Sequence, residues 1–261
     1  MEIKVALGQM AIALARPDQN VETARALAAQ AADQEVDLLI LPELWPSGYD
    51  LARAHRYAEP LDRGPFAVMA GLAQEHHLHV VGTCLEEHPT GKPRNTAALY
   101  GPDGKREAVY HKVHLFAPMG EVEHLTAGDD LPVFDLPWGR VALAICYDLR
   151  FPEMWIRYAN AHAELVLIPA EWPVSRVEHW RLLLRARAVE NQFFVAGCNR
   201  AGSDQDGEFP GHSAVIDPSG RVLVEAGAEP GLFVATLDLD EVERRRRRNF
   251  WIKDRRPDVY G

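Results

Sequence analysis

Short apolar runs alternate along the chain with longer segments whose apolar residues recur at helical spacing. Lys4–Met10, Asp37–Leu41 and Val141–Ile145 are runs of the first kind, and Asp37–Leu41 is apolar nearly throughout, as expected of a strand covered on both faces. Val21–Gln34 is an Ala-rich segment of the second kind. This alternation predicts an α/β fold in which helices cover a sheet.

Two hairpins are also predicted, so the sheet should be mixed. Asn95–Tyr100 and Glu107–His111 flank the turn sequence Gly-Pro-Asp-Gly, and His212–Asp217 and Arg221–Glu225 flank Pro-Ser-Gly. The pattern alone leaves open whether the strands form one sheet or two. The same reasoning predicts further helices at Gly64–His77, Glu153–His162 and His179–Asn191, and strands at Val80–Leu85, Leu165–Ile168, Phe193–Gly197 and Leu232–Leu237.

Composition excludes several classes of partner. The 261 residues carry 28 Lys+Arg against 38 Asp+Glu, a formal net charge of −10, which a nucleic-acid phosphate backbone would repel. No run approaches the roughly 18–20 apolar residues needed to cross a bilayer, and the start lacks the pattern of a signal peptide. The three cysteines lack metal-binding spacing. We expect a cytoplasmic, soluble chain with one domain over residues 1–261, no nucleic-acid or membrane partner and no metal.

A cysteine directly follows one of the buried strand patterns. Cys146 comes after Val141–Ile145 and before a turn that leads into a helix. Backbone N–H groups at such a helix start favour a thiolate and can hold an oxyanion, so Cys146 is a candidate nucleophile. The alternative is that Cys146 packs as a small buried hydrophobe, which is the interpretation we prefer for Cys84 and Cys198.

Two other strand patterns also end in a reactive side chain. Glu43 closes DLLILPE, and Lys112 closes AVYHK. A desolvated glutamate is a usable general base, and a lysine can stabilise developing negative charge. Taken singly, either residue could be solvated at the surface. Because ligand sites of α/β sheets gather at the carboxyl ends of strands, the combination with Cys146 favours a catalytic site.

The segments around these residues resemble the signature blocks of the nitrilase superfamily of carbon–nitrogen hydrolases. They are LPELWPSGY, YHKVHLF and ALAICYDLRFPE, which contain Glu43, Lys112 and Cys146 respectively. The intervals between the three residues also suit that superfamily. The similarity continues through RARAVENQFFVAGCNRAGS, GHSAVIDPSG and DRRPDVY, and thus over essentially the whole chain. Within the superfamily, the blocks are most similar to the omega-amidase-like group, which acts on small dicarboxylate monoamides.

The resemblance implies a four-layer α-β-β-α sandwich with two mixed sheets and a Glu–Lys–Cys triad. Cys146 would be the nucleophile, Glu43 the general base and Lys112 the cation that stabilises the tetrahedral intermediate. The backbone N–H of Tyr147 would be the second oxyanion donor. The family places a further glutamate after the lysine block, and its spacing selects Glu121, with Glu123 as the alternative.

Substrate contacts are expected from residues near the strand exits. Tyr49 and Trp172 would line the pocket or pack beside it. Arg150 would bind a substrate carboxylate or form a structural ion pair with Glu153. Glu171 stands where the omega-amidase-like relatives tend to have asparagine, and an acid facing the pocket would disfavour an anionic substrate.

We therefore predict a thiol-dependent amidohydrolase that converts a small aliphatic amide, such as 2-oxoglutaramate, to a carboxylate and ammonia through a cysteinyl thioester. No organic cofactor or metal is implied. The alternatives are an N-carbamoyl amine amidohydrolase or a nitrilase on the same fold, or a non-catalytic binding module. The family also implies a homodimer or larger homo-oligomer.

Overall fold

Parallel strands occupy the centre of each of two sheets, and antiparallel strands occupy the edges. The computed structural model describes residues 1–261 except 90, 206, 249–250 and 261. In the first sheet the strand order is β14-β1-β2-β3-β4-β5, with β1, β2 and β3 parallel and the other neighbours antiparallel. Its strands are β1 (Glu2–Gln9), β2 (Leu38–Ile40), β3 (His79–Glu86), β4 (Arg94–Tyr100), β5 (Arg106–His111) and β14 (Gly231–Asp238).

The second sheet repeats this plan with the order β13-β12-β9-β8-β7-β6. Strands β7, β8 and β9 are parallel, and β6, β12 and β13 extend them antiparallel. A separate pair, β10 with β11, lies beyond β9 along the chain. The bounds are β6 (Val133–Leu136), β7 (Gly139–Leu143), β8 (Leu165–Ala170), β9 (Phe194–Asn199), β10 (Ala201–Asp204), β11 (Gly207–Pro210), β12 (Ala214–Ile216) and β13 (Val222–Glu225).

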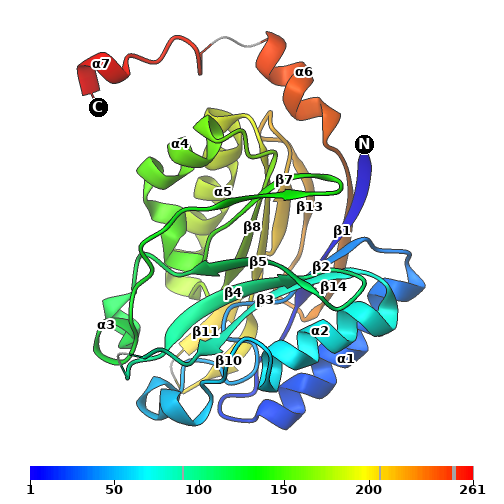
Figure 1. Cartoon of the computed structure of the whole chain (residues 1–261), viewed down its shortest axis with the longest axis vertical. Helices are drawn as coiled ribbons and strands as arrows, with labels where there is room; N and C mark the ends of the chain where they lie inside the picture. Colours follow the sequence, from blue (N-terminus) through cyan, green and yellow to red (C-terminus); the bar gives the residue numbers. More distant parts are fainter. Residues whose placement is uncertain (90, 206, 249–250, 261) are drawn as a thin grey trace.

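Alternating side chains hold the layers together, because successive residues of a strand point to opposite faces. On β2, Ile40 packs in the core shared with Leu143 of the second sheet, whereas Leu39 packs outward with Leu27 and Leu72 of the helices α1 and α2. On the other side, α4 and α5 cover the second sheet (Figure 1). The covering helices are α1 (Pro17–Asp33), α2 (Gly64–His76), α4 (Pro152–Asn160) and α5 (Val177–Asn191). The predicted four-layer sandwich is confirmed.

Short helices connect the strands at one end of the sheets, and two more close the chain. They are the 3₁₀ helices η1 (Leu51–Arg56), η2 (Ala117–Met119), η3 (Cys146–Arg150) and η4 (Val174–Arg176), and the α-helices α3 (Glu121–His124), α6 (Asp240–Arg248) and α7 (Pro257–Tyr260). Figure 1 shows α6 and α7 extending beyond the sheets, at the end where the chain begins. In the ranges that the structure describes, no helix has the length and apolar character that crossing a membrane requires.

Sequence patterns missed three strands. β6 is a four-residue edge strand, and the β10–β11 pair is short and rich in glycine and polar residues, so neither has the apolar alternation that marks a buried strand. The predicted helix Val21–Gln34 begins earlier, at Pro17, because proline is well tolerated in a first helical turn. The other predicted elements are present with end shifts of a few residues.

Candidate active site

Three side chains meet at the ends of three strands. Glu43 follows β2, Lys112 follows β5, and Cys146 begins η3 after β7. Lys112 Nζ donates to Glu43 Oε1 at 2.7 Å, and both side chains are completely buried. The two sheets therefore bring Glu43 and Lys112 of the first sheet against Cys146 of the second.

The backbone of Cys146 adopts a left-handed conformation, with φ of +43°. Such a φ is uncommon for a residue with a side chain and marks a sharp turn between β7 and η3. Burial raises the pKa of the Cys146 thiol, and the carboxylate of Glu43, to which the thiol donates, raises it further. The resting cysteine is thus a neutral thiol hydrogen-bonded to Glu43. Cys84 and Cys198 are also buried with raised pKa values, but desolvation alone raises them.

The second glutamate at the site is Glu121. Its carboxylate lies 2.8 Å from Lys112 Nζ, whereas Glu123 of the same short helix is exposed. Asn95 of β4 donates from Nδ2 to Glu43 Oε1 at 2.8 Å and to Glu121 Oε1 at 3.2 Å. No sequence pattern marks Asn95 as a site residue, because an asparagine within a hairpin strand is common and carries no characteristic spacing.

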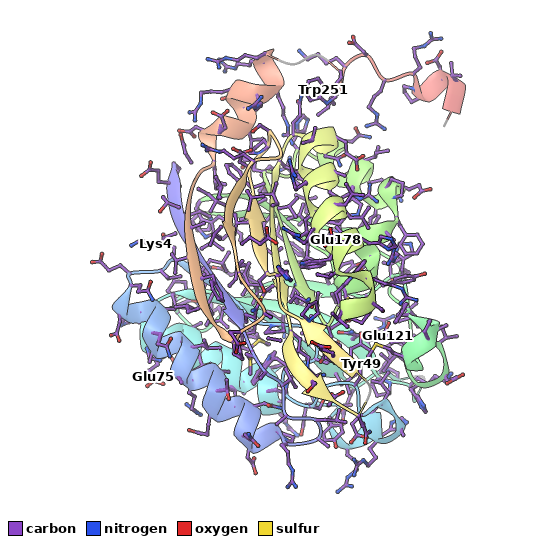
Figure 2. All side chains as sticks on the ribbon, turned by 180° about the vertical axis from the view of Figure 1, so that it is seen from behind. Lys4, Tyr49, Glu75, Glu121, Glu178 and Trp251 are labelled. Carbon is purple, nitrogen blue, oxygen red and sulfur yellow. The ribbon has the colours of Figure 1, made fainter. Side chains whose placement is uncertain are left out.

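Two carboxylates flank the buried lysine. Burial opposes the ammonium form of Lys112, but Glu121 and Glu43 outweigh it, so the pKa of Lys112 is raised. Burial raises the pKa of Glu121, and Lys112 counteracts that rise. Tyr49 lies against this group, donating from its hydroxyl to Glu121 Oε1 at 3.1 Å, and Figure 2 shows the two side chains side by side. Tyr49 thus contacts the buried glutamate rather than the cleft described below.

Asp148 fixes the turn that carries the cysteine. This fully buried carboxylate accepts hydrogen bonds from the Ile145 N–H at 2.9 Å, from the Tyr110 hydroxyl at 2.7 Å and from the His114 N–H at 3.0 Å. Its partners come from β5, from the segment after β5 and from Ile145, the residue before η3. Asp148 therefore ties the turn holding Cys146 to the strand that leads to Lys112. Asp148 lies within the sequence block around Cys146, but no local pattern predicts this structural role.

A small, open cleft lies beside the cysteine. It is lined by Phe116, Cys146, Tyr147, Arg150, Glu171, Trp172, Pro173 and Arg176. The indole N–H of Trp172 donates to the Arg176 carbonyl at 2.7 Å, and this bond fixes the part of the cleft that these two residues line. The backbone N–H of Tyr147 lies in the first turn of η3, where N–H groups have no acceptor within the helix and remain available to a ligand.

Glu171 lines the cleft, and its carboxylate pairs with Arg200, which does not line the cleft. Its Oε2 accepts from Arg200 Nη1 at 2.7 Å, and both residues are buried. Its backbone N–H also donates to Glu43 Oε2 at 3.0 Å. Burial raises the pKa of Glu171 to about 8, although Arg200 opposes this rise. The acid that the sequence placed at the pocket is therefore paired with a guanidinium of the same chain.

Arg150 makes neither an ion pair with Glu153 nor one with any other carboxylate in the described part of the chain. Its guanidinium lies over the Trp172 ring, 4.6 Å from the ring centroid, and contacts His179 Nδ1 at 3.4 Å. Burial and the neighbouring Arg176 lower the pKa of Arg150. The structure thus leaves its positive charge facing the cleft without a partner acid.

A family model described as carbon-nitrogen hydrolase matches residues 4–247. The chain belongs to the carbon–nitrogen hydrolase family. This carbon–nitrogen hydrolase is 39% identical over 253 residues to a 2-oxoglutaramate amidase of Bacillus subtilis (strain 168), with 97% of each chain covered.

Solved structures give the same result. Nit3 of Saccharomyces cerevisiae, a member of the nitrilase superfamily, superposes on this carbon–nitrogen hydrolase with a TM-score of 0.88 and 32% identity, covering 95% of this chain and 94% of the other. A mutant amidase from Nesterenkonia sp. AN1, in which acrylamide has added to the active-site cysteine, superposes with a TM-score of 0.83 and 32% identity. The match covers 94% of this chain and 97% of the other. The predicted superfamily and the predicted class of enzyme, a hydrolase of carbon–nitrogen bonds, are confirmed.

Proposed function

We propose that the enzyme hydrolyses the terminal amide of a small carboxylated amide such as 2-oxoglutaramate, releasing ammonia through a thioester on Cys146. The observation that carries this proposal is the buried contact of Lys112 with both Glu43 and Glu121 beside the cysteine thiol. The 2-oxoglutaramate amidase relative supports the choice of substrate.

In the first half of the reaction, Glu43 accepts the thiol proton as the Cys146 sulfur bonds to the amide carbon. Because the thiol pKa is raised, proton transfer accompanies attack instead of preceding it. The carbonyl oxygen gains negative charge, which Lys112 and the Tyr147 backbone N–H stabilise. Glu43 then returns the proton to the amide nitrogen, the carbon–nitrogen bond breaks, and ammonia leaves a thioester.

In the second half, water hydrolyses the thioester. Glu43, again a carboxylate, takes a proton from the water as its oxygen bonds to the acyl carbon. The same donors hold the oxyanion, the carbon–sulfur bond breaks, and the proton passes to the Cys146 sulfur. The products are the resting thiol and a carboxylic acid, which releases its proton to solvent and leaves as a carboxylate. Glu121 keeps Lys112 in place and charged throughout.

Three broader proposals accompany this one. Residues 1–261 form one domain, supported by the core that both sheets share. The chain acts in the cytoplasm, which its three free cysteines fit.

The chain assembles as a homodimer or larger homo-oligomer. The exposed apolar side chains Leu182 and Val222 support this proposal, because they form an uncovered apolar face beside α5 that a second subunit would bury. Light scattering that gives one chain mass at assay concentration would contradict the assembly.

Ammonia release tests the activity directly. The wild type and Cys146→Ala are assayed with 2-oxoglutaramate, glutamine, butyramide and an N-carbamoyl amine, and the carbon dioxide that a carbamoyl substrate also yields is measured. We expect release from 2-oxoglutaramate that Cys146→Ala abolishes. Release only from the carbamoyl substrate would replace the amidase proposal, and unchanged release by Cys146→Ala would exclude the thioester route.

A further inference from the structure

Asn95 and Lys112 donate hydrogen bonds to the same two carboxylate oxygens. The amide nitrogen Nδ2 of Asn95 lies 2.8 Å from Glu43 Oε1 and 3.2 Å from Glu121 Oε1. The ammonium nitrogen Nζ of Lys112 lies 2.7 Å from the first of these oxygens and 2.8 Å from the second. Two donors and two acceptors thus alternate in a closed ring of four hydrogen bonds. All four side chains are buried, and loss of Asn95 would open the ring.

The orientation of the Asn95 amide follows from its neighbours. An amide has two N–H donors on its nitrogen and an acceptor oxygen beside it. The reverse orientation would place that oxygen against two carboxylates, which would repel it. Over the residues that the structure describes, Oδ1 of Asn95 is buried and accepts no hydrogen bond. The site therefore uses the nitrogen of Asn95, and both of its N–H groups point to carboxylates.

The two oxygens of Glu43 are occupied unequally. Oε1 accepts from Lys112 and from Asn95, which fills both of its lone pairs. Oε2 accepts from the Glu171 backbone N–H at 3.0 Å, which leaves one lone pair for a further donor. A proton on Oε1 would displace Lys112 or Asn95, whereas Oε2 can take a proton without losing a bond. Oε2 is thus the oxygen that can receive the proton of the Cys146 thiol, which donates to this carboxylate.

We propose that Asn95 is a positioning residue for the proton transfer of this reaction, and that it directs the proton of Cys146 to Oε2 of Glu43 by occupying Oε1. The inference rests on the proposed amidase function and adds the group that orients its general base. As the Sγ–H bond breaks, the proton bonds to Oε2 and the sulfur electron pair bonds to the amide carbon. Oε2 then gives the same proton to the leaving nitrogen. Asn95 does not line the cleft, and it neither gains nor loses a proton.

Asn95→Leu removes both N–H donors and keeps a side chain of similar size. Oε1 of Glu43 then has a free lone pair that can hold the proton, in competition with Oε2. We expect kcat for 2-oxoglutaramate to fall about tenfold to a hundredfold, the effect of losing a hydrogen bond to a charged group. KM should change by less than about threefold, because Asn95 lies outside the cleft that binds the substrate. Steady-state ammonia release measures both constants.

Asn95→Asp separates the donor role from the filling of space. The new carboxyl has the shape of the amide, but it donates a hydrogen bond only when it is protonated. Beside two carboxylates, it binds a proton increasingly as the pH falls. We expect kcat of Asn95→Asp, divided by kcat of the wild type, to rise at least about threefold from about pH 8 to about pH 6. The same ratio for Asn95→Leu should stay flat. The Asn95→Asp ratio alone decides the question where Asn95→Leu fails to fold.

The matched control is Thr96→Val at the next position of β4. Thr96 is as buried as Asn95, but its hydroxyl donates to Glu86 at 2.7 Å instead of to a catalytic carboxylate. This change should lower the midpoint of urea unfolding and keep kcat within about twofold of the wild type.

Three results would each overturn the positioning role while cysteine-dependent ammonia release by the wild type still upheld the amidase. They are a kcat of Asn95→Leu within about twofold of the wild type, an equal loss of kcat in Thr96→Val, and an Asn95→Asp ratio that does not rise as the pH falls. A wild type that releases no ammonia from any amide would overturn both proposals.

Discussion

At the scale of single residues, the site contains one buried cation against two buried carboxylates. Lys112 can neutralise only one of them, and Glu43 must also accept a proton during the reaction. The raised pKa of Glu121 follows from burial beside Glu43. We infer a division of labour in which Glu121 holds Lys112 through the bond of 2.8 Å, so that Glu43 remains free to exchange protons with Cys146.

Glutamine at position 121 tests this division. Glu121→Gln removes the charge that keeps Lys112 in its ammonium form, so we expect kcat to fall at least about a hundredfold, the loss typical of one electrostatic group. Steady-state kinetics with 2-oxoglutaramate measures it. Glu123→Gln is the control, since Glu123 is exposed on the same helix and its replacement should keep kcat within about twofold. The reverse order of effects would assign the role to Glu123.

The pH dependence of substrate preference should report Glu171, whose pKa is raised to about 8. At neutral pH the raised value keeps much of this carboxyl group protonated, and its charge grows as the pH rises through about 8. A carboxylated substrate is then disfavoured. We expect KM for succinamate, divided by KM for butyramide, to increase between about pH 7 and about pH 9.

In Glu171→Gln the same ratio should stay nearly flat, since glutamine does not titrate. A ratio that rises equally in this variant would show that another group causes the pH dependence. Dividing the two KM values removes contributions from the thiol and the lysine, which act on the amide common to both substrates.

At the scale of elements, the loop after α3 braces the end of β5. The Gly128 N–H donates to the Lys112 carbonyl at 2.8 Å, and a Cβ at Gly128 would lie 2.3 Å from the His111 carbonyl oxygen. Only glycine permits this approach, because the neighbouring atom belongs to the backbone and cannot rotate away.

Gly128→Ala should therefore displace the strand end that carries Lys112. We expect a loss of about 2–4 kcal/mol in the free energy of unfolding and a fall in kcat, measured by urea denaturation and ammonia release. Gly71→Ala is the opposite case. A Cβ there meets nothing within 4 Å, and Gly71 is exposed within α2, so alanine should stabilise the fold by about 0.5–1 kcal/mol. Full activity in Gly128→Ala would contradict the bracing role.

Sequence patterns predict best those site residues whose positions depend on a single strand and the point where it ends. Glu43, Lys112 and Cys146 each follow a buried strand directly, so local periodicity indicated a reactive side chain at each of three strand exits, and the resemblance to the nitrilase superfamily supplied their joint role. Arg176 and Asn95 could not be found this way. Their positions depend on how η4 and the β4–β5 hairpin pack against elements remote in sequence, and no local pattern encodes that packing.

At the scale of the whole molecule, the site forms only where the two sheets meet. Glu43, Lys112 and Glu121 belong to the first half of the chain, and Cys146 belongs to the second. The shared core between the sheets, with Ile40 on one side and Leu143 on the other, therefore sets the distance between base and nucleophile. The stability of the sandwich and the geometry of the triad have the same physical origin.

β14 comes from the second half of the chain but pairs with β1 in the first sheet, in a register that runs from Glu2 opposite Asp238 to Gln9 opposite Gly231. The two halves of the chain thus share a sheet. They suit a split-enzyme reporter, in which two separate fragments regain activity only after they associate. Fragments 1–129 and 130–261 should each be silent, and should recover ammonia release when refolded together at a rate that depends on concentration. Removing β14 by ending the second fragment at residue 229 should abolish recovery. Turnover by either fragment alone would show that the opposite half is dispensable.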